Sequence, residues 1–498
     1  RESAVLTGPI LQDMPILAAE KVRYFGEPVA IVVADEEWQA AQAVKSIRVE
    51  YQPLPVVNTI EDALASNAPL VHPGLMQYAR TVPDVYPEEN TNIANRVKIR
   101  KGDIAQGWKD SAVVVEAEYR IPQASHAFLE TRNARAQILP GGQVVIHTAN
   151  QAPHAVRSLL AKYFSLSEND ITVEVPFVGG AYGGKINPHP ELLAYIASRA
   201  VGGREVRVAY TREESFYASP CKIGAKVVMK LGADKTGKLQ ALQAAYYIDS
   251  GAYADSTPVM AKAVAVSCSG AYYIPHIQCD SVCVYTNHVY TTSFRGFGHG
   301  VSTFAIERTM DKLADKMGID PAQLRLLNAA REGDDSPTQV PYTKSNLGDV
   351  SACISRLKKI MQWDDSICTK ASGSVVRAMG HGLFHQNVHH PHGRIVLGHH
   401  DILLGRFRQL KLQRNRMRAG HDFFTAQTAG AKAENESRQD IGEPYRQHAL
   451  PSGALENGGQ HVHVHGGKRR PCRRRRRDKA AESQRRAGTE MQTGRYRD

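Results

Sequence analysis

Two glycine-rich segments carry the residues of this chain that could do chemistry. The first consists of Gly179, Gly180, Ala181, Tyr182, Gly183, Gly184 and Lys185, and the second runs from Ser293 to Gly298 with Arg295 and Phe297 inside it. Glycines let a backbone approach a bulky anionic ligand and turn several N–H groups toward one oxygen-rich object. The basic residues add fixed charge, and the rings offer flat walls for a planar molecule. The pair predicts a site for a large anionic cofactor beside a small planar substrate.

Strands and helices at recognisable spacing must position these segments. Pro190 begins a predicted helix through Ala200, whose N-terminal amides could add to an anion site. After Gly298 an apolar helical face continues until Gly318, and Asp320 then caps the next helix. The other elements expected around the first segment are strands over 112–119, 136–139, 144–148 and 171–176, a helix over 152–164, and a hairpin of 226–231 with 238–248.

The N-terminal part reads as a compact α/β unit. Two short strands are predicted over 21–34 around a Gly26-Glu27-Pro28 turn. A helix capped by Asp35 follows through Ile47, and Arg48 to Tyr51 returns as a strand. Four prolines between 67 and 95 indicate a linker to the next domain. The first residue is Arg1, and we expect the natural chain to begin upstream of it.

Charge is distributed unevenly along the 498 residues. The net charge is +12, but residues 377–498 hold 24 Lys and Arg against 11 Asp and Glu, whereas the rest holds 38 against 39. The globular part is therefore neutral, which argues against nucleic acid as its ligand. The seven cysteines show no C-x-x-C pair, and no apolar run reaches the length of a membrane span. These features predict a cytoplasmic protein without its own iron–sulfur cluster.

The two segments, read with their flanks, resemble the molybdenum-cofactor subunit of the xanthine dehydrogenase and aldehyde oxidase family. The resemblance runs from about Pro15 to Gly380 and includes Gly26 to Ala30, His126 to Glu130, and Asp320 to Arg325. It implies an α+β protein: part of an α/β hammerhead domain, then the first half of a molybdopterin-binding domain. The implied boundaries are 1–62 for the hammerhead remainder, 63–95 for a linker, 96–380 for the first molybdopterin domain, and 381–498 for an anomalous, disordered tail.

The resemblance also implies roles for particular residues. Gln151 stands where relatives have a glutamine that hydrogen-bonds an oxygen ligand of molybdenum, and an amide can donate there without adding charge. Tyr182 and Phe297 would wall the substrate ring, and Arg295 would hold the pterin or the loop. No residue is expected to bind the metal directly. The implied cofactor-binding set is Gln151, Gly179, Gly180, Ala181, Tyr182, Gly183, Gly184 and Arg295, and the implied substrate pocket is Tyr182, Ile186 and Phe297.

Departures from the family pattern narrow the range of expected substrates. Purine-oxidising relatives carry a glutamate where this chain has Ile186 and an arginine where a gapless alignment gives Ala263. Their absence favours an aldehyde or a simpler N-heterocycle, although Glu191 or His189 could substitute. The resemblance implies oxidation with oxygen from water, with electrons leaving to iron–sulfur clusters and FAD on partner subunits. The general-base glutamate belongs to the second half of the domain, so no catalytic residue is assigned and weak or no activity is expected.

From His381 the sequence loses strand and helix periodicity and becomes rich in His, Arg, Gln and Gly. A reading-frame shift near codon 380 explains this change most economically. The alternative, from another functional class, is a cofactor-free interaction protein with a genuine basic tail. Its histidines at 461, 463 and 465 would bind metal, and residues 468–477 would bind nucleic acid.

Overall fold

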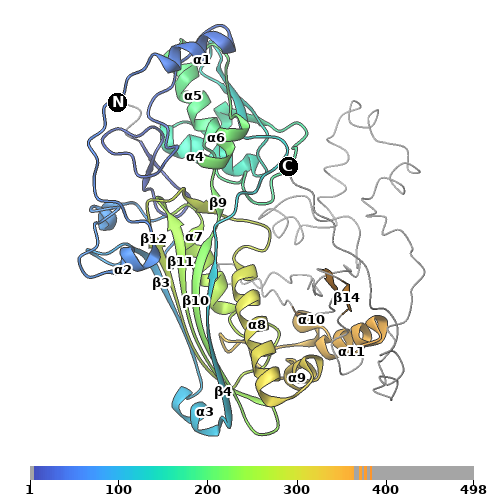
Figure 1. Ribbon diagram of the computed structural model, residues 1–498. Helices are drawn as coiled ribbons and strands as arrows, with labels where there is room; N and C mark the ends of the chain where they lie inside the picture. Colours follow the sequence, from blue (N-terminus) through green and yellow to red (C-terminus); the bar gives the residue numbers. More distant parts are fainter. Residues whose placement is uncertain (1–4, 364–369, 373–374, 378–381, 384–498) are drawn as a thin grey trace, which may run out of the picture. The chain divides into compact units, whose positions relative to one another are not determined.

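The computed structural model describes residues 5–363, 370–372, 375–377 and 382–383 (Figure 1). The chain divides into two units. In the smaller, residues 367–379 and 436–498, the described residues form an antiparallel hairpin of β14 (Lys370–Ser372) and β15 (Val375–Arg377). Everything described below belongs to the larger unit. Its mixture of separate helices and sheets confirms the predicted α+β class.

A five-stranded sheet forms the largest of three hydrophobic cores in the described part of this unit; the smallest gathers Met14, Tyr24, Ala252, Tyr253 and Tyr290. Its strands, in spatial order, are β3 (Ile93–Lys101), β12 (His276–Tyr285), β11 (Leu239–Gly251), β10 (Gly224–Ala233) and β4 (Val113–Ile121). Neighbours are antiparallel except β11 and β12, which run parallel and are joined through helix α7 (Thr257–Val266). Such a crossover suits a parallel pair, because a tight turn cannot connect two strands of the same direction.

Local chemistry explains the elements around this sheet. The β10–β11 hairpin turns where Asp234 accepts hydrogen bonds from the backbone N–H groups of Thr236 and Lys238. Helix α8 (His299–Met317) packs along β4 and β10, and Gly318, at φ 68°, ends it in the left-handed conformation. Helix α9 (Pro321–Asn328) then begins under its predicted Asp320 cap, which accepts from Gln323 N–H at 2.9 Å.

A four-stranded sheet forms the second core. Its strands, in spatial order, are β7 (Ile171–Glu174), β6 (Val144–Thr148), β5 (Asn133–Ile138) and β8 (Val206–Ala209). Helices α4 (Pro153–Phe164) and α5 (Pro190–Ala200) pack against it. The pairing of β6 with β7 is parallel, while the other pairs are antiparallel. The parallel pair matters for function, because it brings the carboxyl ends of β6 and β7 side by side.

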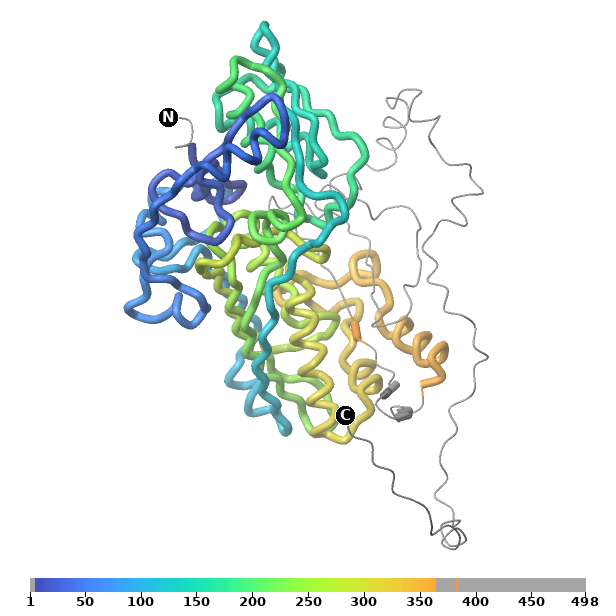
Figure 2. The backbone as a smooth tube through the Cα atoms, turned by 45° about the horizontal axis from the view of Figure 1, so that its top comes forward, coloured from blue at the N-terminus to red at the C-terminus, as the bar shows by residue number. Residues whose placement is uncertain are grey.

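The N-terminal segment differs from its prediction. Residues 21–34 and 48–51 form no strands, and helix α1 (Glu37–Lys45) starts from Glu36 rather than Asp35 and buries no residue. Strands need a neighbouring strand to satisfy their backbone groups, and neither stretch has one among the described residues, although 21–34 is partly buried and only 48–51 is exposed throughout. The predicted turn at Gly26 is present. Within it, Glu27 is buried and accepts hydrogen bonds from the Tyr253 hydroxyl and, at 2.6 Å, from Arg23 N–H. Figure 2 shows this blue segment running beside the second core.

The predicted linker over 67–95 is in fact partly buried. Val71, Leu75 and Val85 belong to the core of the five-stranded sheet, and β3 already begins at Ile93. The remaining elements of this unit lie outside the two larger sheets. They are β1 (Leu6–Thr7), β2 (Met14–Pro15), α2 (Ile60–Leu64), η2 (Leu75–Gln77), α3 (Ile104–Asp110), η3 (Glu168–Asp170), α6 (Arg212–Tyr217), β9 (Cys221–Lys222), β13 (Thr291–Thr292), α10 (Lys344–Leu347) and α11 (Val350–Met361).

The tail beyond 380 lies outside the described residues, apart from Gly382 and Leu383. The expected frame shift, the disorder, the histidine cluster and the basic run therefore concern residues without a described structure. Leu383 itself is buried in the core of the five-stranded sheet. Across the described part of the chain, no helix combines the length and apolar character needed to cross a bilayer.

Candidate cofactor site

The first glycine segment and Gln151 meet because two neighbouring strands end together. Gln151 follows β6, and the segment from Gly179 to Lys185 follows β7, its parallel neighbour. Ligands of such sheets commonly bind beyond the carboxyl ends of the strands. The second segment enters from elsewhere: it connects β13, which pairs with β9, to the start of α8.

Gln151 is held firmly on one side and lacks a partner on the other. Its backbone N–H donates to the carbonyl of Lys185 at 3.0 Å, and its side-chain Oε1 accepts from Gly183 N–H at 3.1 Å. Its side-chain Nε2 is buried and has no hydrogen-bond partner in the described structure. Leaving a buried donor unsatisfied costs about 1–3 kcal/mol, so a hydrogen-bond acceptor at this amide would stabilise the site.

The glycines of the first segment are required by its shape. Gly180 and Gly183 have φ values of 95° and 102°, and Gly184 N–H closes a tight turn onto the Ala181 carbonyl at 2.8 Å. A Cβ on Gly183 would lie 2.6 Å from the carbonyl oxygen of Ser293. The structure thus brings the two predicted segments into direct contact at this position.

The predicted pocket residues belong to the two segments or directly follow them, but the structure does not gather all of them at this contact. Tyr182 lies between the glycines at φ 53°, and its side chain remains 46% exposed. The guanidinium of Arg295, which is exposed, lies 6.0 Å from the Tyr182 ring centroid, within cation–π range. Ile186 is half-buried, and Phe297, at φ 49°, packs against the core of the five-stranded sheet. Two strained non-glycine residues in one small region are typical of functional loops.

Glu130 and Lys185 are functional candidates whose pairing the sequence did not reveal. Glu130 Oε2 accepts from Lys185 Nζ at 2.9 Å and from Gly179 N–H at 2.7 Å. Burial opposes the charge on Glu130, but these bonds prevail and hold the pKa of its carboxyl below the usual value. Burial also lowers the pKa of Lys185, against the pull of Glu130. The two positions are 55 residues apart, so neither helical nor strand periodicity could connect them.

The start of helix α5 is not the open anion site that its sequence suggested. Glu191 is buried there and accepts from His189 N–H at 3.0 Å, from Thr148 at 2.6 Å and from Asn150 at 3.0 Å. His189 is equally enclosed, its Nδ1 lying 2.6 Å from the Tyr210 hydroxyl, and burial lowers its pKa to about 3. An internal carboxylate therefore occupies the place of an external anion.

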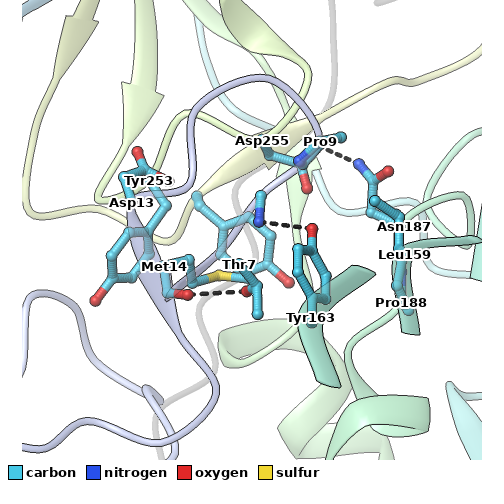
Figure 3. Close-up of a pocket in the computed structure, with 12 residues that line it drawn as sticks. Thr7, Pro9, Asp13, Met14, Leu159, Tyr163, Asn187, Pro188, Tyr253 and Asp255 are labelled. Carbon is cyan, nitrogen blue, oxygen red and sulfur yellow. Dashed lines mark hydrogen bonds between the residues drawn. The ribbon is translucent and has the colours of Figure 1, made fainter. Parts of the chain in front are cut away.

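A small cavity in the structure lies apart from this site. The N-terminal segment, α4, the loop before α5 and the loop after β11 contribute to its lining, including Tyr163, which is labelled in Figure 3. The Tyr163 hydroxyl accepts a hydrogen bond from Gly8 N–H at 2.9 Å. Asn187 donates to Asp255 at 2.8 Å on another side. None of the predicted cofactor or substrate residues lines this cavity. The candidate site is instead the region where the two glycine segments touch, with Tyr182 and Arg295 exposed and Gln151 Nε2 buried.

Known proteins are similar to this chain in sequence and in architecture. Residues 85–329 match the molybdopterin cofactor-binding domain, and residues 2–55 match the a/b hammerhead domain of aldehyde oxidase and xanthine dehydrogenase. The nicotinate dehydrogenase large molybdopterin subunit of Eubacterium barkeri is 30% identical over 330 residues, which are 66% of this chain and 73% of that protein. A probable xanthine dehydrogenase subunit of Bacillus subtilis is 32% identical over 336 residues, 67% of this chain and 42% of that one.

Solved structures agree with these sequence matches. The aldehyde oxidoreductase of Desulfovibrio gigas superposes with a TM-score of 0.66 at 29% identity, covering 72% of this chain and 39% of that one. Quinoline 2-oxidoreductase of Pseudomonas putida 86 gives 0.63 at 29% identity, covering 72% and 45%. This chain thus spans about half or less of the Bacillus relative and of both solved structures. The resemblance inferred from the glycine segments is confirmed: the chain belongs to the xanthine dehydrogenase and aldehyde oxidase family of molybdenum oxidoreductases, as a molybdopterin-binding large subunit.

Proposed function

We propose that this chain forms part of the cofactor cradle of a molybdenum hydroxylase that oxidises an aldehyde or an N-heterocycle with oxygen from water. The observation that carries the proposal is the buried Nε2 of Gln151, which has no partner within the described structure although its Oε1 is fixed by Gly183. Molybdopterin with its bound molybdenum supplies the redox chemistry when present. The residues of this chain bind and orient that group.

The residues present fit an anionic, oxygen-rich cofactor. Gln151 Nε2 would donate to an oxygen atom of the cofactor and so relieve its own burial cost. The backbone of Gly179 to Gly184 would lie against the cofactor, with Gly180 and Gly183 allowing the turns at φ 95° and 102° that side chains rarely adopt. Arg295, exposed beside Tyr182, would offer a planar cation to the pterin or its phosphate.

The weak polarity of the residues proposed for the substrate pocket supports the preference for an aldehyde or a simple N-heterocycle. Tyr182, Ile186 and Phe297 would line it, and Ala263 adds no charge. Glu191 and His189, the two groups that could have replaced the missing purine-binding residues, already bind internal partners. A purine would therefore leave its polar ring atoms without matching groups, which costs affinity.

We also propose how the chain works with others. Electrons would pass to iron–sulfur and FAD-binding partner subunits in the cytoplasm, and no general base is assigned within 1–380. The hammerhead remainder would cover 1–62, the linker 63–95, and the first molybdopterin domain 96–380. With half of the cradle and the base contributed from outside these ranges, the isolated chain would turn over weakly or not at all.

Metal analysis and substrate screening test the proposal together. The full chain, expressed in a host that makes molybdopterin, should retain molybdenum in proportion to protein. Adding candidate partner subunits should give dye reduction with aldehydes or N-heterocycles and little with purines. Absence of molybdenum from a folded chain that still binds its partners would favour the cofactor-free interaction protein. Turnover of purines would refute the proposed substrate class but not the proposed cofactor-binding role.

A further inference from the structure

We propose that Glu130 and Lys185 form a latch that holds the first glycine segment in its cofactor-binding shape. Glu130 is then a positioning residue, acting through the loop without touching the cofactor. The inference rests on the proposed function of that segment and deepens it. It assigns a role to a pair that neither motif spacing nor the comparisons single out.

The latch joins the two ends of the segment at one atom. Oε2 of Glu130 accepts from Gly179 N–H at 2.7 Å and from Lys185 Nζ at 2.9 Å, and these are the first and last residues of the segment. The backbone N–H of Glu130 also donates to the Gly179 carbonyl at 3.1 Å. Glu130 thus fixes Gly179 through both its main chain and its side chain.

Burial makes Lys185 dependent on this carboxylate. Its side chain is 2% exposed, and its Nζ lies 4.7 Å from the centroid of the Phe128 ring. A charge removed from water to this degree is stable only when paired. The Glu130 side chain is 31% exposed, so water can solvate it if the pair is broken. The free-energy cost of breaking the pair therefore arises mainly from the buried charge of Lys185 and destabilises the loop that carries it.

The loop transmits this constraint to Gln151. The Lys185 carbonyl accepts the Gln151 backbone N–H at 3.0 Å, and Gly183, two residues earlier, donates to Gln151 Oε1. The direction of the unpartnered Nε2 is therefore set by two contacts with the segment that the latch closes. Breaking the Glu130–Lys185 pair should loosen both contacts of Gln151. It does so without substituting any residue whose side chain is proposed to face the cofactor.

Hydrogen exchange on the full chain, without cofactor, tests the latch directly. In Glu130→Gln, the hydrogen-bonded amides of Gly179, Gly183 and Gly184 should exchange at least about tenfold faster, as expected for loss of a hydrogen bond to a charged group, while β10 and β11 stay unchanged. Lys185→Met removes the buried charge together with the pair, so it should fold and show the same local acceleration. Lys262→Met is the matched control, because its 2.8 Å bond to Asp84 joins two side chains that are both about two-fifths exposed.

The latch proposal would be overturned if exchange within residues 179–185 were unchanged in Glu130→Gln. It would also be overturned if both variants accelerated exchange equally in this segment and in the five-stranded sheet. Bound molybdenum separates this outcome from failure of the proposed function. If wild-type chain retains molybdenum, both latch variants should retain less and Lys262→Met the same amount; equal retention counts against the latch. If wild-type chain retains none, the proposed function fails, while the exchange result still decides whether the latch exists.

Discussion

Arg325 of helix α9 donates from Nε to the Glu307 carboxylate of helix α8 at 2.9 Å, with its side chain only 1% exposed. The same guanidinium reaches Asp311 at 2.9 Å, and the Tyr272 hydroxyl donates to Glu307 from the other side. Burial opposes these charges, and the paired carboxylates hold the pKa of Arg325 above its usual value. This network fixes the helix that follows directly from the second glycine segment.

Replacing Arg325 by methionine should destabilise the protein strongly. Glu307 would be left buried without its cation, and breaking such a pair costs about 3–5 kcal/mol. Urea unfolding followed by circular dichroism measures the loss. Arg204→Met is the control, because its 2.8 Å pair with Asp35 is 74% exposed on both sides and should change stability by less than about 1 kcal/mol. Equal effects of the two variants would contradict a dominant role of the buried network.

The donor at Gln151 can be removed while its acceptor is kept. Gln151→Glu preserves an oxygen for Gly183 N–H but replaces Nε2 by a second oxygen. We expect much lower molybdenum per chain, because that oxygen would face the oxygens of the cofactor. The variant should still fold, as judged by its thermal midpoint. Molybdenum content equal to that of the wild type would refute the assigned role of the amide.

Gly183→Ala should disrupt the contact between the two glycine segments. The added methyl group would meet the Ser293 carbonyl at 2.6 Å in a backbone conformation of φ 102°. Backbone strain and collision together should cost more than about 2 kcal/mol. Gly142→Ala shares the positive φ, at 87°, but meets nothing within 4 Å, so it isolates the strain alone at about 1 kcal/mol. Denaturant unfolding of both variants gives the difference.

Asp13 should make the protein less stable as the pH rises. Burial raises its pKa to about 7, against the opposing hydrogen bonds from Ala254 N–H and Tyr285, both at 2.8 Å. The folded state therefore binds this proton more tightly than the unfolded state, and its stabilising effect is lost between about pH 4 and pH 7. Asp13→Asn should remove a decline on the order of a few kcal/mol over this range. Parallel stability curves for both proteins would contradict the assignment.

Prediction from sequence succeeded where the signal is local. Helix α5 begins and ends at the predicted Pro190 and Ala200, because proline is pre-organised for the first helical position. Gly318 and Asp320 mark the junction of α8 and α9 as expected, since a left-handed cap and a side-chain cap each need one suitable residue. The glycines at 180 and 183 were likewise readable from type alone.

Features set by distant partners were not predictable in the same way. The expected strands at 21–34 and 48–51 had suitable side chains but no neighbouring strand among the described residues. Strand β12 was missed, because its parallel register with β11 depends on a crossover through α7. The Glu130–Lys185 pair and the occupied start of α5 arise from residues that only the fold brings together. The role proposed for Gln151 rests on the family resemblance, not on any pattern around it.

The contact between Gly183 and Ser293 has a thermodynamic consequence. Gly183 follows β7 of the four-stranded sheet, whereas Ser293 lies between β13 and helix α8, which packs on the five-stranded sheet. A ligand gripped by both segments is therefore bound by two separate hydrophobic cores at once. Its binding free energy would add to the cooperativity between them, because opening either core would require the ligand to leave. The cofactor would therefore stabilise the folded state in addition to taking part in the reaction.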